Sequence, residues 1–184
     1  EINAWLKADA FGMEDLTPTR LYVYAAMAGG LQMVQDRKRL GYLLKSKSEP
    51  TAIAATASLV QLGKKDGARE VARLLSRRKG YDLISYRIKL LDAIARSATD
   101  SGVGILVRLL KSKDEDLRAV VMGSLGVAAN NKAAIEGLVK GLMDNNSRVR
   151  ASALRSLEGV VKRVGGSVIM IGPLIAYLDL EKQY

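Results

Sequence analysis

Apolar residues recur along this chain at the three- and four-residue spacing of amphipathic helices, and the pattern itself is repeated. The clearest copy spans residues 131–162, where an apolar stripe at 135–142 precedes the polar corner DNNS at 144–147. A second apolar stripe follows at 149–161. Because Asp, Asn and Ser end one helix and cap the next, this pattern predicts a hairpin of two helices.

Similar hairpins occur at regular intervals along the sequence. The motifs LLKSKSE, LLSRRKG, LLKSKDE and LMDNNSR begin at residues 43, 74, 109 and 142, at separations of 31, 35 and 33 residues. A single hairpin of this size cannot bury its own apolar stripe, so neighbouring copies are expected to stack on one another. The predicted repeats are 1–30 (degenerate), 31–63, 67–98, 101–130 and 131–164, followed by a closing helix at 165–184.

These copies resemble the short HEAT repeats common in bacterial proteins. The resemblance rests on Asp114 with Leu117-Arg118 and on Asp144 with Val149-Arg150. In that family, an Asp in the corner and an Arg early in the second helix form a ladder of contacts between neighbouring repeats. The resemblance implies this structural role for Arg87, Arg118, Asp144 and Arg150; the copy at 35–62 lacks the Arg.

The resemblance also implies a fold and a way of working. The expected fold is all-α, a right-handed α-α superhelical solenoid of about five helix pairs plus the closing helix, forming one domain over residues 1–184. Each repeat then exposes two surfaces to solvent, its corner and the outer surface of its second helix. Binding is expected at one of these two repeated surfaces, although the fold does not name the ligand.

The composition narrows the chemistry that is available. The chain of 184 residues has no Cys and no His, which excludes disulfides, Cys/His zinc sites and Ser-His or Cys-His nucleophile pairs. A carboxylate or lysine enzyme remains compatible with this composition. We nevertheless expect no catalytic site, no metal and no cofactor.

Positive charge is concentrated in the middle of the chain. The net charge is +10, and residues 37–113 alone hold 18 basic and 6 acidic residues. Stacked corners would bring seven of these cations into one line, here named the basic ridge: Lys45, Lys47, Arg77, Arg78, Lys79, Lys111 and Lys113. The ridge has two interpretations, a site for an anionic partner or ordinary helix capping and solubility.

These features favour a non-catalytic scaffold that binds a partner protein. The surface of that partner is expected to be acidic where it contacts the basic ridge. The alternative is nucleic-acid binding, with residues 37–113 contacting the phosphate backbone. A peripheral contact with an anionic membrane surface is a third possibility. No transmembrane segment is expected, because the longest apolar run, residues 168–178, has 11 residues and a spanning helix needs about 20.

The chain begins at Glu1 rather than Met, as expected for a fragment or a processed product. The predicted location is the bacterial cytoplasm, where the short repeats are common. An exported, processed protein is the alternative.

Overall fold

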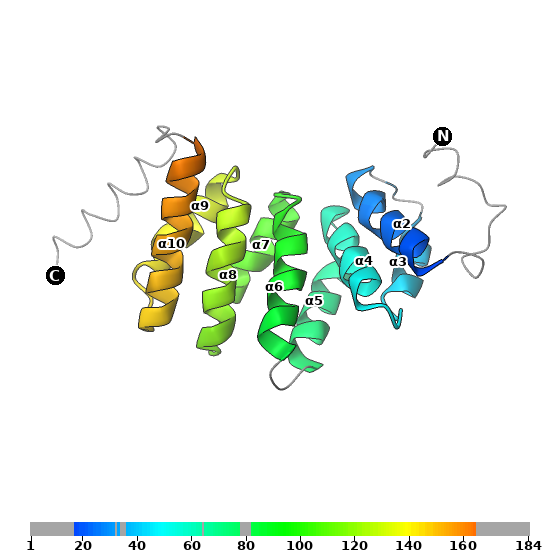
Figure 1. Ribbon diagram of the computed structural model, residues 1–184, viewed down its shortest axis with the longest axis horizontal. Helices are drawn as coiled ribbons and strands as arrows, with labels where there is room; N and C mark the ends of the chain where they lie inside the picture. Colours follow the sequence, from blue (N-terminus) through cyan, green and yellow to red (C-terminus); the bar gives the residue numbers. More distant parts are fainter. Residues whose placement is uncertain (1–16, 32, 34–35, 64, 78–81, 165–184) are drawn as a thin grey trace. The chain divides into compact units, whose positions relative to one another are not determined.

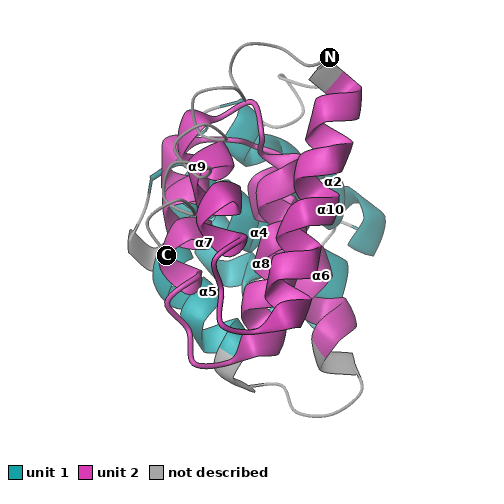
Figure 2. Ribbon diagram, turned by 90° about the vertical axis from the view of Figure 1, so that its left-hand side faces the viewer, with its two compact units in different colours: residues 1–76 teal, residues 77–184 magenta. Residues whose placement is uncertain are grey.

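The computed structural model describes residues 17–31, 33, 36–63, 65–77 and 82–164. Within these ranges the regular elements are all helices, α2 to α10, and no strand occurs (Figure 1). The prediction of an all-α fold is therefore confirmed for the described part of the chain. The chain divides into two compact units, residues 1–76 and 77–184, which Figure 2 colours separately.

The first unit contains α2 (Pro18–Gly30), α3 (Arg37–Leu43), α4 (Glu49–Gln61) and most of α5 (Lys65–Arg77). Thr17 caps α2 by accepting a hydrogen bond from the Arg20 N–H, and Pro18 occupies the first turn, where its missing N–H costs nothing. Helices α2 and α3 both pack against α4. The core they enclose contains Tyr24, Ala25, Ala28, Met33, Leu40, Leu43, Ala54, Ala55, Leu59 and Leu62.

Helices α2 and α4 approach one another closely. The Ser58 hydroxyl donates to the carbonyl of Ala25 and accepts from the N–H of Gly29 at 3.1 Å. A Cβ added to Gly29 would lie 2.7 Å from the Cα of Ser58, so only glycine fits there without a shift. Small residues thus allow α4 to pack closely against α2. Every residue of α4 from Thr51 to Val60 is buried.

The second unit alternates helices between two layers. Helices α6 (Asp82–Ala95), α8 (Glu115–Val127) and α10 (Ser147–Val164) lie side by side, with α8 in the middle. Behind them lie α7 (Asp100–Leu109) and α9 (Lys132–Gly141), as Figures 1 and 2 show. Each rear helix packs against its two neighbours in the front layer, and α7 also contacts α9.

Side-chain caps fix where the helices of this unit begin. Thr99 caps α7, Asp114 caps α8 and Asn131 caps α9, each accepting a hydrogen bond from a first-turn N–H at 3.0–3.2 Å. Such caps satisfy N–H groups that have no partner inside the helix. Polar corners therefore separate the helices at the positions that the apolar spacing predicts.

Equivalent positions have different surroundings along the second unit. Met122 of α8 is 1% exposed, and a Cβ added to Gly141 of α9 would lie 2.3 Å from its sulfur. Leu154 lies 32 residues later on α10 and is 61% exposed. Within the described ranges no helix follows α10, so Leu154 has no counterpart of Gly141 to cover it.

None of the helices in the described ranges combines the length and the apolar content needed to cross a bilayer.

Candidate functional site

Ion pairs join successive helix pairs at the corners of the second unit. Arg87 of α6 donates to the carboxylate of Asp114 at 2.6 Å. Arg118 of α8 donates through Nε and Nη2 to both oxygens of Asp144, at 2.8 and 2.9 Å. In each case an Arg contacts the corner Asp of the next helix pair. These contacts have the form that the HEAT resemblance implies.

Arg150, the fourth residue of the implied ladder, contacts its own corner instead. Its guanidinium donates to the main-chain carbonyls of Asp144 and Asn145, at 2.8 and 3.0 Å. These two hydrogen bonds hold the corner that precedes α10 against the first turn of that helix. In the described part of the chain, Arg150 contacts no corner of a later repeat.

The two ladder carboxyls are held in the charged form by their donors. Burial raises the pKa of Asp114, but hydrogen bonds from the Leu117 N–H and the Arg87 guanidinium outweigh it and leave the pKa below its ordinary value. The hydrogen bonds from Arg118 lower the pKa of Asp144 against its own burial. Both pairs therefore stabilise the stacked helices at neutral pH.

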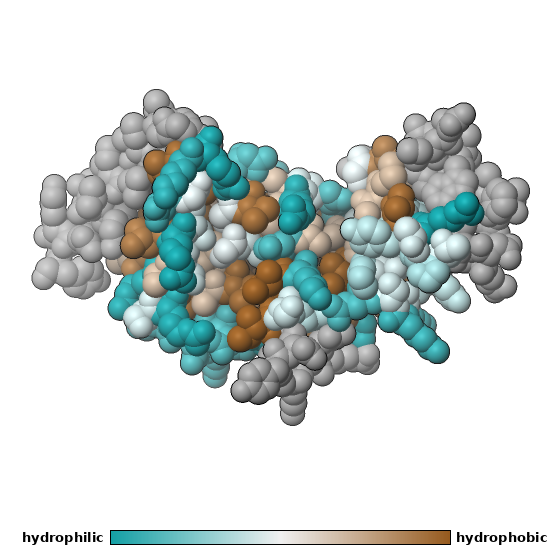
Figure 3. Space-filling view, in the orientation of Figure 1, coloured by the Kyte–Doolittle hydropathy of each residue, from teal (hydrophilic) through white to brown (hydrophobic). Residues whose placement is uncertain are grey.

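The front layer of the second unit contains a groove of about 460 Å³. Helix α6 forms one wall, α10 forms the other, and α8 forms the floor. Apolar surface gathers over α6 and α8 near the middle of this face, as Figure 3 shows. The lining residues are Ile84, Ile88, Asp92, Asp116, Ala119, Val120, Gly123, Arg148, Ser152, Arg155 and Ser156.

The groove is hollow because its floor carries small side chains. Ala119 and Gly123 lie one helical turn apart on α8, and a Cβ added to Gly123 would have no heavy atom within 4 Å. On the α6 wall, Ile84 and Ile88 are each 44% exposed. Large side chains on α6 and α10 thus stand on either side of a low strip on α8.

Polar contacts between positions 32 residues apart hold the three helices in register. Arg148 of α10 donates to Asp116 of α8 at 2.7 Å, and the Ser124 hydroxyl of α8 donates to Asp92 of α6 at 2.6 Å. The same spacing relates Ile88 on α6 to Val120 on α8. The groove is therefore a product of the repeat, built from equivalent positions on three helices.

The residues of the basic ridge lie in several places. Lys45 and Lys47 are exposed in the corner between α3 and α4, and Lys111 and Lys113 are exposed in the corner between α7 and α8. Within the described residues, none of these four side chains forms an ion pair. Arg77 is the last residue of α5, whereas Arg78 and Lys79 lie outside the described residues. A continuous ridge stays a prediction.

The sequence interpretation named the outer surface of the second helices but did not single out the groove residues. Ile84 and Ile88 follow the helical spacing, as core residues do, and nothing in their identity marks them as exposed. A signal does exist, because Tyr86, Leu90 and Ile94 define a different face of the same helix. Because Ile84 and Ile88 lie outside that face, the sequence indicates that they are apolar residues on the surface.

A comparison with models of protein families found no match for this chain, and a comparison with curated proteins found none either. The described residues contain no group of three or more Asp or Glu side chains placed to hold a metal ion. Membership of the HEAT family accordingly stands as a proposal.

Proposed function

We propose that this chain is a non-catalytic scaffold that binds a partner protein in the groove between α6, α8 and α10. The observation that carries the proposal is the pair Ile84 and Ile88, each 44% exposed on the wall of a groove of about 460 Å³. A solvent-facing helical surface ordinarily carries polar residues at such positions. Apolar side chains gathered in a hollow beside a few polar groups are typical of a binding site.

The proposal includes a right-handed HEAT-type solenoid of about five helix pairs with a closing helix. Its support is the recurrence of Arg–Asp contacts between helix pairs, first Arg87 with Asp114 and then Arg118 with Asp144. The closing helix, predicted at 165–184, lies outside the described residues. A cytoplasmic location is likewise part of the proposal.

A pair of variants separates the groove from the basic ridge as the binding surface. The groove variant carries Ile84→Ser and Ile88→Ser, and the ridge variant carries Lys111→Glu and Lys113→Glu. All four side chains are exposed or half-exposed, so both variants are expected to fold, which circular dichroism checks.

Co-purification from the source cell followed by mass spectrometry gives the readout. We expect wild type and the ridge variant to retain a stoichiometric partner protein that the groove variant loses. Retention by the groove variant, or the absence of any stoichiometric partner on wild type, would overturn the proposal.

Nucleic-acid binding through the phosphate backbone is the second candidate. It is supported by Lys45, Lys47, Lys111 and Lys113, which are exposed and form no ion pair within the described residues. Cations of this kind bind phosphates with a steep dependence on salt and little base specificity. They would also serve an anionic membrane surface.

Titration of labelled duplex and single-stranded DNA at about 50 and 200 mM salt tests this candidate. If this candidate is correct, the protein binds DNA at the lower salt concentration, and the affinity falls steeply at the higher one. No binding at the lower salt would remove it.

A further inference from the structure

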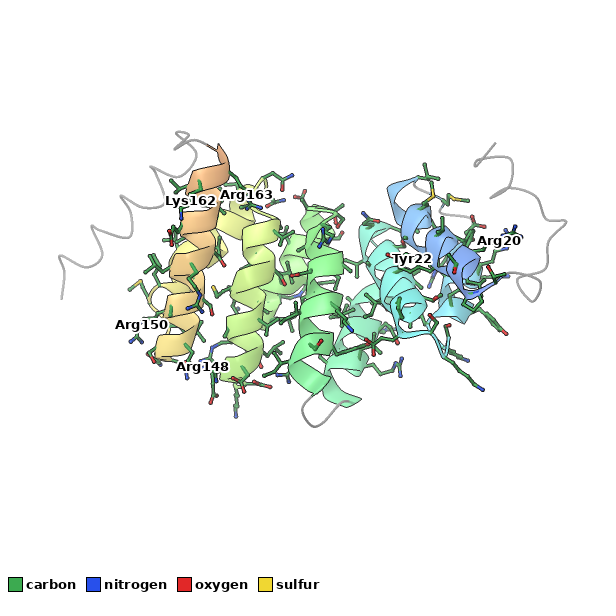
Figure 4. The ribbon with its side chains drawn as sticks, in the orientation of Figure 1. Arg20, Tyr22, Arg148, Arg150, Lys162 and Arg163 are labelled. Atoms are coloured by element: carbon green, nitrogen blue, oxygen red, sulfur yellow. The ribbon has the colours of Figure 1, made fainter. Side chains whose placement is uncertain are left out.

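The two walls of the groove differ in chemistry. The α6 wall presents Ile84 and Ile88 along one helical turn. The α10 wall is polar and belongs to a strongly basic helix, whose only acid, Glu158, accompanies Arg148, Arg150, Arg155, Lys162 and Arg163. Figure 4 shows Arg148 and Arg150 toward one end of α10 and Lys162 and Arg163 toward the other.

Among these cations, Arg155 is the one in the groove that has no carboxylate partner within the described residues. Its guanidinium donates to the Ser152 hydroxyl at 3.2 Å, which uses one of its five N–H groups. Arg148, which also lines the groove, is already paired with Asp116. Arg163 donates to the carbonyl of Gly126. Arg155 is therefore the free cation of this wall.

The opposite wall carries an acidic side chain. Asp92 of α6 lines the groove and accepts a hydrogen bond from the neutral Ser124 hydroxyl, and it has no cationic partner within the described residues. A ligand carboxylate is attracted toward Arg155 and repelled from Asp92. The charges thus fix which side of a ligand carries acid and which side carries apolar groups.

The shape and lining of the groove select among the common modes of peptide recognition. An added β-strand needs an exposed sheet edge, and the described residues contain no strand. A polyproline segment needs aromatic walls, and no aromatic residue lines this groove in the part of the chain that the structure describes. An amphipathic helix needs an apolar wall and a low floor, which Ile84, Ile88 and the strip Ala119–Gly123 provide.

The low floor of the groove also suits a helix. Axes of packed helices lie about 8–10 Å apart, and the separation depends on the side chains at the contact. Because Gly123 has no side chain, a ligand helix can approach α8 closely.

From these observations we infer that the occupant of the groove is an acidic amphipathic helix of the partner protein, lying along α8. Its apolar stripe packs on Ile84 and Ile88, and a carboxylate on the adjoining face pairs with Arg155. This inference rests on the proposed function, because it specifies the ligand of the same groove.

Three synthetic peptides of 18 residues test the inference directly. The first is an amphipathic helix with leucines on one stripe and glutamates on the adjoining face. The second replaces each glutamate by lysine, and the third keeps the glutamates but places a proline at the centre to break the helix. Each is titrated by fluorescence anisotropy against wild type, Arg155→Glu and Lys140→Glu.

The Lys140→Glu variant is the matched control, because Lys140 is an exposed cation on α9 in the rear layer. We expect the glutamate helix to bind wild type and the control equally and to bind Arg155→Glu about tenfold more weakly. The lysine helix should gain affinity for Arg155→Glu, and the proline peptide should not bind.

Several results would overturn the inference. Equal binding of the glutamate and lysine helices, undiminished binding of the proline peptide, or no binding of the glutamate helix each contradicts it. If sedimentation showed a dimer that Ile84→Ser with Ile88→Ser converts to a monomer, the occupant would be a second copy of this chain. The proposed function is judged separately, by whether that groove variant loses the cellular partner.

Discussion

Arg118 and Asp144, which lie 26 residues apart in the sequence, meet in an ion pair with two hydrogen bonds, from Nε to Oδ2 and from Nη2 to Oδ1. Their side chains are 14% and 16% exposed, so the pair is largely withdrawn from water. The Arg comes from the second helix of one pair and the Asp from the corner of the next. One contact thereby fixes the register of two successive helix pairs.

Removal of one partner from this buried pair should destabilise the fold strongly. We expect Asp144→Ala to lower the free energy of unfolding by about 2–3 kcal/mol, because Arg118 loses both charge-assisted hydrogen bonds. Arg118 then keeps the Ser112 carbonyl as an acceptor and has Glu115 and Asp114 as nearby acids. Urea unfolding followed by circular dichroism measures the change.

The control for this change is Asp116→Ala. The Arg148–Asp116 pair has side chains that are 69% and 44% exposed, so its loss should cost about 1 kcal/mol or less. Equal losses at the two positions would contradict the assignment of Arg118 and Asp144 as the buried register pair.

The stability of the protein should fall in acid because of the ladder carboxyls. Hydrogen bonds from Arg118 lower the pKa of Asp144 in the folded chain, whereas in the unfolded chain an Asp titrates near its ordinary value of about 3.9. The unfolded state therefore takes up a proton first. The stabilisation is complete above about pH 5, where an unfolded Asp is ionised, and is lost as the pH falls through the folded pKa.

Urea unfolding at a series of pH values from about 2 to 6 measures this dependence. In Asp144→Asn the loss of stability in this window should be smaller than in wild type, since one of the responsible groups is gone. An unchanged acid dependence in that variant would show that Asp144 does not contribute to it.

Equivalent apolar positions one repeat apart should differ sharply in their effect on stability. Met122 is 1% exposed and Leu154 is 61% exposed. We expect Met122→Ala to cost about 2–5 kcal/mol through lost packing and Leu154→Ala to change stability by about 0.5 kcal/mol or less. Thermal or urea unfolding of the full chain compares them. A large cost at Leu154 would mean that this side chain is covered in solution.

Two adjacent glycines in α2 should respond to alanine in opposite ways. At Gly29 a Cβ would lie 2.7 Å from the main chain of Ser58, so Gly29→Ala should destabilise by about 1–3 kcal/mol. At Gly30 a Cβ meets nothing within 4 Å, and Gly30→Ala should stabilise by up to about 1 kcal/mol. Urea denaturation of both variants reports the difference. Similar effects at the two sites would rule out the close packing of α2 on α4.

The spacing of apolar residues was enough to predict the helices and most of their corners. The corner DNNS, for example, correctly separates α9 from α10, because its meaning depends on local capping. The HEAT resemblance names Arg118 and Asp144 as ladder residues, but it matches Asp144 with Arg150 by spacing. The contact between Arg118 and Asp144 of the next helix pair is a finding of the structure.

Features that depend on packing at a distance were not predictable in the same way. Ile84 and Ile88 lie on another face of α6 than the buried Tyr86, Leu90 and Ile94, which indicates surface residues. Only the positions of α8 and α10 make that surface one wall of a groove. The same holds for Gly29, whose lack of a side chain matters only because α4 lies against it. Sequence spacing fixes the faces of one helix, whereas the neighbours that cover each face are set by the stack.

The most direct test of the groove is to fill it without disturbing the helix beneath. Gly123→Leu places a large side chain on the floor, where a Cβ meets no heavy atom within 4 Å. Gly104→Leu makes the same change on α7, outside the groove, at a position where a Cβ likewise meets no heavy atom within 4 Å.

The measurement is the equilibrium affinity of the co-purified partner for wild type and for these two variants. We expect Gly123→Leu to weaken binding at least about tenfold and Gly104→Leu to leave it unchanged. Equal affinity for all three proteins would contradict the claim that the groove along α8 is the binding surface.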